Sequence, residues 1–169
     1  MRLPFLKPKP LTSPAALYAA IVSAARQPEW YRDAQVPDTM DGRFAVLTSL
    51  LALADIRLER GGGGARALGP RLTEAYIADM DAQMRQAGFG DPSLGKQVRM
   101  MVGSLASKID RWRLAVSSVE PWADVARRSL YRESPPGEAA AEAGVAATKT
   151  WWERLQRADD GDIIAGRIA

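Results

Sequence analysis

One stretch of this chain has the spacing of a phosphate-binding loop. Gly90 and Gly95, followed directly by Lys96, fit the first part of the pattern G-x-x-x-x-G-K. Gln97 stands where a Ser or Thr would bind magnesium, and the stretch follows a helical pattern rather than a strand. Pro92 also removes one backbone N–H from a loop whose function is to present such groups. We therefore interpret this stretch as the start of a helix with a solvent-exposed lysine.

The side chains that most often carry acid–base, nucleophilic or metal chemistry are absent or scattered. The chain has no histidine and no cysteine, which removes the commonest general base, the commonest metal ligand, thiolate nucleophiles and disulfides. The neighbouring carboxylates Asp79 and Asp81 are two residues apart, so a helix directs them to different sides. We expect no catalytic site, no metal site and no cofactor, and we predict that the protein is not an enzyme.

The composition is that of a globular protein with a small basic excess. The 169 residues are 47% hydrophobic and 25% charged, which is enough for one domain with a core. A net charge of +3 suits an acidic partner, an anionic membrane surface or a ribosome, without selecting among them. No segment approaches the roughly 18 to 20 apolar residues of a membrane span, and the most apolar stretch, residues 45–56, has the length of a core helix.

Residues 1–12 are predicted to form a flexible N-terminal arm, followed by a single helical domain over residues 13–169. Pro4, Pro8 and Pro10 interrupt any regular structure in the arm. The arm lacks the apolar region and cleavage site of a secretory signal, so we expect none. Its few apolar and basic residues could contact an anionic membrane surface, although one such arm is a weak anchor and a frayed terminus is the simpler interpretation.

Apolar residues recur at steps of three and four along the domain, which predicts helices. Ser13 and Pro14 signal the start of the first helix, and Asp38 or Thr39 the start of the second. The second helix is apolar over a broad arc, so we expect it to be central and largely buried. No stretch alternates with period two for long enough to predict a strand. The predicted fold is an all-α, single-domain irregular helical bundle of about six helices.

A corner between the third helix and the longest helix organises the chain. Gly88 suits the left-handed residue that ends a helix, and Asp91 and Pro92 suit the N-cap and first position of the next. The long helix carries one apolar stripe, made of Leu94, Val98, Met101, Val102, Leu105, Ile109, Trp112 and Val116. Its other faces are basic, with Lys96 and Arg111 opposite the stripe and Arg99, Lys108 and Arg113 on the flanks.

Two further expectations concern the remaining segments. Gly61–Gly64 should end the second helix and form a flexible surface link. In the alanine-rich helix near the C-terminus, the spacing places Trp152 and Leu155 on the inner side and turns Trp151 away from the core.

Two stretches resemble the signatures of a known family. The first comprises Leu17-Tyr18, Ala25-Arg26-Gln27-Pro28, Trp30-Tyr31, Val36-Pro37-Asp38-Thr39 and Gly42-Arg43-Phe44. The second comprises Ala78-Asp79-Met80-Asp81, Met84-Arg85, Gly88-Phe89-Gly90-Asp91 and Gly95-Lys96-Gln97-Val98. In order and approximate spacing they resemble the ubiquinol–cytochrome c chaperone family. The resemblance implies an all-helical, non-enzymatic assembly chaperone for the cytochrome bc1 complex (respiratory complex III), acting on newly made cytochrome b.

The same resemblance implies partners and a location. Mitochondrial relatives act near the ribosome exit site together with a small helical partner, and bacterial relatives are expected in the cytoplasm at the inner membrane. For this chain we expect a cytoplasmic protein that makes peripheral contact with the inner membrane. Its expected partner is cytochrome b or another bc1 subunit, with the ribosome and a small partner protein as further candidates, and no specific nucleic acid.

Two interpretations of the signature residues stay open. Arg26, Asp38 and Arg43 could simply tie the first connector to the helix ends, because polar groups at such positions need partners. The alternative is a docking surface, an apolar patch rimmed by positive charge, made of Trp30, Tyr31, Arg43, Lys96 and Arg99. A different function is also open, namely a helical module that binds the ribosome or RNA through the basic face of the long helix. Its affinity would fall steeply as the salt concentration rises.

Overall fold

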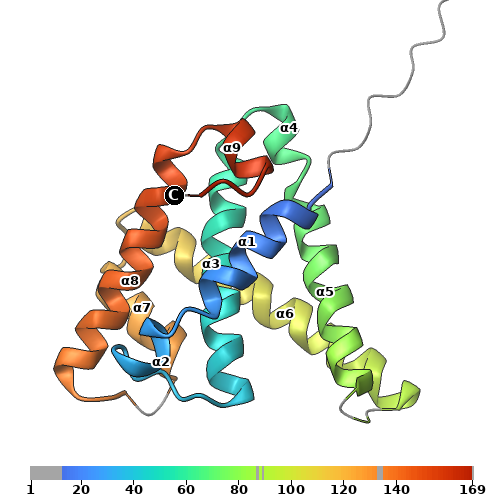
Figure 1. Ribbon diagram of the computed structural model, residues 1–169, viewed down its shortest axis with the longest axis horizontal. Coiled ribbons are helices and arrows are strands. Elements are labelled where there is room, and N and C mark those ends of the chain that lie inside the picture. Colours follow the sequence, from blue (N-terminus) through green and yellow to red (C-terminus); the bar gives the residue numbers. More distant parts are fainter. Residues whose placement is uncertain (1–12, 87, 89, 133–134, 169) are drawn as a thin grey trace, which may run out of the picture.

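A computed structural model describes residues 13–86, 88, 90–132 and 135–168, and for residues 91–94 it describes the backbone alone. Within these residues the chain forms nine helices and no strand (Figure 1). They are α1 (Ala15–Ala25), α2 (Glu29–Arg32), α3 (Met40–Glu59), α4 (Gly63–Arg66), α5 (Gly69–Gln86), α6 (Asp91–Val116), α7 (Trp122–Tyr131), α8 (Glu138–Arg157) and α9 (Asp160–Ile164). Six of these helices have ten residues or more, which confirms the all-α fold of about six helices. The predicted arm, residues 1–12, lies outside the described residues.

Helix α3 lies at the centre of the bundle, and α1, α5, α6, α7 and α8 all pack against it (Figure 1). Every residue from Ala45 to Ala54 is buried, as its broad apolar arc predicts. Thr39 caps the helix, its hydroxyl accepting a hydrogen bond from the Gly42 N–H at 3.2 Å. A side chain at Gly42 would place Cβ 1.9 Å from the Pro37 carbonyl oxygen, so the connector can pass this close only over a glycine. None of the described helices has the length and hydropathy needed to cross a membrane.

The corner between α5 and α6 forms largely as predicted. Gly88 has a φ of +89°, the left-handed conformation that ends a helix. Helix α6 begins at Asp91 with Gly90 as its N-cap, so the predicted N-cap at Asp91 is wrong by one residue. Gly95 and Lys96 therefore lie inside a helix, and the stretch is not a phosphate-binding loop.

The apolar stripe of α6 is narrower than predicted. Leu105 and Trp112 are buried, whereas Val102 is 36% exposed, although α3, α5 and α7 all pack against α6. Leu94, the predicted first member of the stripe, is one of the residues for which the structure describes the backbone alone. The C-terminal half of α6 therefore supplies most of its contribution to the core.

Two predictions outside α6 are wrong. Trp151 does not point away from the core: it is 5% exposed and its indole N–H donates to the Leu50 carbonyl at 3.2 Å. Helix α8 packs against both α3 and α7, and its buried residues include Trp151 beside Trp152, so its buried surface is wider than one stripe. The glycine link is not free, because part of it forms α4 and the Gly62 N–H donates to Asp160 at 2.7 Å. Arg57 also donates to Asp160, at 2.9 Å, which fixes α9 against the end of α3.

Candidate functional site

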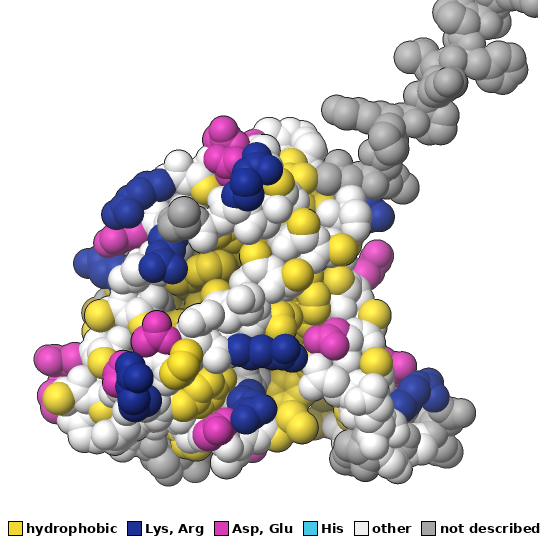
Figure 2. Space-filling view, viewed as in Figure 1, with side chains coloured by type: hydrophobic (Ala, Val, Ile, Leu, Met, Phe, Trp, Pro, Cys, Tyr) yellow, Lys and Arg dark blue, Asp and Glu magenta, His cyan; other side chains and the backbone are white. Residues whose placement is uncertain are grey.

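Two adjoining pockets open beside the N-terminal half of α3. The first, of about 900 Å³, lies between α1, α3 and α5, and the second, of about 540 Å³, is bounded by α3, α5, α6 and α7. Both are lined by Met40, Phe44 and Gln83, so we describe them together as the methionine groove. Figure 2 shows hydrophobic side chains in the hollow between α3 and α5, with Lys and Arg side chains beside them.

Every methionine after Met1 lines this groove. The five are Met40, Met80, Met84, Met100 and Met101. Met40 and Met100 are each 59% exposed, which is unusual for large apolar side chains. Methionine is unbranched and polarizable, so a surface made of it can adjust to partners of different shape. A concave surface of this kind is typical of a binding site for an apolar partner.

Positive charge surrounds the apolar lining. The groove is lined by seven basic side chains: Arg26, Arg32, Arg43, Lys108, Arg111, Arg128 and Arg132. It is lined by only three acidic ones: Asp38, Asp41 and Asp79. Since the whole chain has a net charge of +3, its basic excess is concentrated at the groove. The site therefore suits a partner that is apolar and carries some negative charge.

At the end of the groove near α1, polar side chains connect the walls. The Arg43 guanidinium donates to Asp38 at 2.7 Å and thereby holds the pKa of this carboxyl below its usual range. The Tyr31 hydroxyl donates to the Ala25 carbonyl at 2.9 Å, and burial raises its pKa. The Tyr18 hydroxyl donates to Asp79 at 2.8 Å and so links α1 to α5. These contacts fix the shape of this end of the groove.

At the opposite end, Lys108 points inward from α6. Its ammonium donates to the Thr48 hydroxyl at 2.8 Å and to the carbonyls of Ala45 and Ser129 at 3.2 Å each, which joins α6 to α3 and α7. Burial, together with the smaller effect of the positive charges of Arg132 and Arg111, lowers the pKa of Lys108 to about 7. The three acceptors are neutral, so this buried ammonium has no counter-charge among them.

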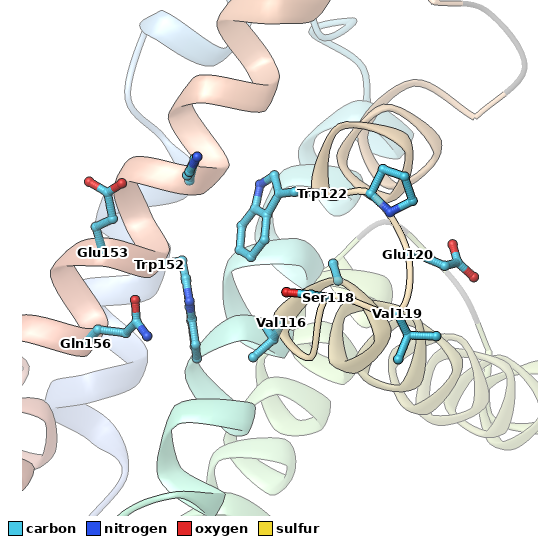
Figure 3. Close-up of a pocket in the computed structure, with 11 residues that line it drawn as sticks. Val116, Ser118, Val119, Glu120, Trp122, Trp152, Glu153 and Gln156 are labelled. Carbon is cyan, nitrogen blue, oxygen red and sulfur yellow. The ribbon is translucent and has the colours of Figure 1, made fainter.

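A separate pocket, of about 610 Å³, lies between the α6–α7 loop and α8, and we call it the tryptophan pocket. Figure 3 shows Trp122 and Trp152 on its walls, from α7 and α8. The Trp122 indole N–H donates to the Thr148 hydroxyl at 3.0 Å, and its ring lies 5.0 Å from that of Trp112 and 6.4 Å from that of Trp152. Among the described residues, no group of three or more acidic side chains could hold a metal ion.

Comparison with known proteins identifies the family of the chain. The family model for the ubiquinol-cytochrome C chaperone matches residues 32–169. The chain belongs to the ubiquinol–cytochrome c chaperone family. The crystal structure of the Cbp3 homolog from Brucella abortus is similar to it, with a TM-score of 0.74 and 25% identity over 92% of this chain and 86% of that chain. No curated protein matches the chain significantly. The family resemblance identified in the sequence is thereby confirmed.

In this member of the ubiquinol–cytochrome c chaperone family, the predicted docking residues do not form one surface. Tyr31 and Arg43 both line the methionine groove. Trp30 is 5% exposed and its indole N–H donates to the Ala24 carbonyl at 2.9 Å, so its predicted place on a docking surface is wrong. The connector forms the short helix α2, which folds this ring under α1. Lys96 and Arg99 are exposed on α6 and line neither half of the groove.

Sequence reasoning missed other groove residues of this family member. Lys108 was expected on a basic flank of the long helix, and this prediction is wrong. Its position was available in the sequence, because Lys108 is three residues after Leu105 and four before Trp112 and so shares their face. Met40, Met100 and Arg111 carried no local signal, since only the packing of α3 against α6 brings them to one groove.

Proposed function

We propose that this protein is a non-enzymatic assembly chaperone for the cytochrome bc1 complex, and that it binds newly made cytochrome b. Membership of the ubiquinol–cytochrome c chaperone family supports the assembly role. We further propose that the methionine groove holds an apolar segment of this client before the segment enters the membrane. The observation that carries this second step is the presence of all five methionines after Met1 on one concave surface.

The groove has the properties that such a client requires. A membrane protein exposes long apolar segments before insertion, and an apolar helix binds well in an apolar groove between helices. Flexible methionine side chains repack against different apolar residues, so one groove accepts segments of varied sequence. Met40 and Met100 are exposed, so such a segment can contact them in the folded chaperone.

The alternative function, ribosome or RNA binding through the basic face of α6, has less support. That face was expected to comprise Lys96, Arg99, Lys108, Arg111 and Arg113. Lys108 is partly buried and directs its ammonium to the Thr48 hydroxyl, and Arg113 pairs with Glu59 at 2.7 Å and with Asp110 at 2.6 Å. A face that binds RNA needs several accessible cations. If this face did bind RNA, its affinity would fall steeply as the salt concentration rises. The ribosome, a small partner protein and the inner membrane remain proposed partners beside the client.

Deletion of the gene in its own organism tests the assembly role. We expect the membranes to lose the b-type haem spectrum and the cytochrome b of the bc1 complex, while other respiratory complexes stay at normal levels. The wild-type gene should restore both. Normal bc1 levels in the deletion strain would mean that the chain shares the fold of the family but not its role.

Complementation with variants tests the groove. We expect Met40→Ser combined with Met100→Ser to leave helix content unchanged and to fail to restore cytochrome b, because the apolar lining is lost. Val119→Ser is a matched control, since Val119 is 69% exposed but lines the tryptophan pocket instead. Full restoration by the double variant would show that the client binds elsewhere.

A further inference from the structure

We infer that the methionine groove recognises an apolar segment that carries a carboxylate, and that Arg111 and Arg132 hold this carboxylate at the α6–α7 end. The inference rests on the proposed function and adds the chemistry of the segment that the groove selects. A segment without an acidic side chain would bind through apolar contacts alone.

The first observation is the state of the two guanidinium groups. Arg111 lines the groove and forms no hydrogen bond or ion pair with any described residue. Arg132 also lines the groove, and its nearest acidic partner, Asp41, lies 3.8 Å away with both side chains more than two-thirds exposed. An ion pair this long and exposed contributes little. Both groups are therefore available to bind an anion. Arg128, by contrast, is paired with Glu120.

The second observation is a concentration of like charge. The Lys108 ammonium is buried among neutral acceptors, and Arg111 and Arg132 are close enough to act on it electrostatically. Three cations at one end of an apolar groove repel one another, and a bound carboxylate would relieve this repulsion. A guanidinium also offers paired N–H donors that match the two oxygens of a carboxylate. The local chemistry thus favours a carboxylate over a neutral polar group.

The shape of the site favours a peptide segment over a membrane surface. Arg111 and Arg132 line a concave pocket that also includes Met84, Met100 and Met101. A flat layer of lipid headgroups contacts basic side chains on a protruding surface and does not enter such a pocket. A helix or extended segment can lay apolar side chains on the methionines while one acidic side chain reaches the guanidinium groups.

The test uses two synthetic peptides and the full chain. Each peptide is an 18-residue helical sequence of Leu and Ala with a fluorescent label, and the two differ only by a central Glu or Gln. We expect fluorescence anisotropy to show the Glu peptide binding about tenfold more tightly, as for a charge-assisted hydrogen-bonded pair. Arg111→Gln combined with Arg132→Gln should remove this preference and leave binding of the Gln peptide unchanged.

Control measurements distinguish a failure of this inference from a failure of the proposed function. Arg99→Gln removes an exposed charge from α6 outside the groove and should change neither affinity; circular dichroism confirms that each variant is folded. Equal binding of the two peptides by the wild type would overturn the inference and leave the proposed function standing. Failure to bind either peptide would overturn both the inference and the proposed role of the groove.

Vesicles of phosphatidylglycerol test a membrane as the partner. If the vesicles bind through Arg111 and Arg132 while the protein does not discriminate between the peptides, the partner is a membrane and the inference is wrong.

Discussion

The tryptophan pocket and the methionine groove are both open hollows lined by large apolar side chains, yet they differ in how those side chains are held. In the tryptophan pocket, Trp122 is fixed by a hydrogen bond to Thr148 and by the neighbouring rings. The guanidinium of Arg60 lies 5.5 Å from the centre of the Trp152 ring. These contacts fix the indoles in place, and Trp152 is only 7% exposed. The pocket is the outer edge of the core.

Two methionines of the methionine groove differ from these indoles. Met40 and Met100 are more than half exposed, and their side chains have rotatable bonds rather than rings. Among the residues that the structure describes, Arg111 has no hydrogen-bond or ion-pair partner, and Arg132 has only the long ion pair with Asp41. The difference indicates that hydrophobicity alone does not identify a binding site in this fold. What distinguishes the groove is that two of its methionines are largely exposed and that two of its arginines are unpaired or only weakly paired among the described residues.

The largest expected effect comes from the tryptophan pocket. We expect Trp152→Ala to lower the free energy of unfolding by about 3–5 kcal/mol, because it removes a buried ring and leaves a cavity. At temperatures where the variant is folded, it should bind the Glu peptide as the wild type does. Urea unfolding and anisotropy on the same preparation measure both quantities.

Met100→Ala is the matched change in the groove. Because Met100 is 59% exposed, its truncation should alter stability by less than about 0.5 kcal/mol while weakening binding of both peptides. If Met100→Ala instead destabilises the protein as much as Trp152→Ala, the groove is part of the core and the contrast between the two hollows disappears.

A smaller effect is expected from Lys108, at the inner end of the groove. Its pKa in the folded chain is about 7, below the ordinary value of 10.5, so between these pH values the unfolded chain binds more protons at this site. The free energy of unfolding should therefore rise with pH, by up to about 2 kcal/mol from pH 7 to pH 8.5. Below pH 7 the ammonium is charged in both states, and its burial opposes folding in full.

The Lys108→Met variant isolates this contribution. It should lack the rise in stability over the same pH range, which thermal unfolding at several pH values would detect. Identical pH dependence in the two proteins would mean that the Lys108 ammonium is solvated in solution, and that it adds no repulsion to the groove.

The helices could be predicted from the sequence because their signals are local. Periodic apolar residues located the six long helices, Thr39 marked the start of α3, and Gly88 the end of α5. The family signatures also indicated the correct family. Each of these features depends on residues that are close together in the chain.

The errors have a common physical origin in tertiary packing. The prediction for α8 assumed that a helix buries one narrow face, but α8 packs against both α3 and α7 and Trp151 is buried. Trp30 was assigned to a connector surface, but α2 folds its ring under α1. The groove itself depends on residues as far apart as Met40 and Met101, so no local spacing could predict it.

The smallest expected effects come from the α1 end of the groove. There, two variants separate a contribution to stability from a contribution to peptide binding. The Tyr18 hydroxyl donates to Asp79, so Tyr18→Phe should cost about 1 kcal/mol of stability and leave the preference for the Glu peptide unchanged. Asp79→Asn keeps an oxygen that accepts this bond and removes a negative charge from the groove lining. It should therefore preserve stability and strengthen binding of the Glu peptide a few-fold, roughly the effect of one partly screened charge. If Asp79→Asn strengthens the Gln peptide equally, the gain is apolar, and charge at this end of the groove plays no part in selecting the segment.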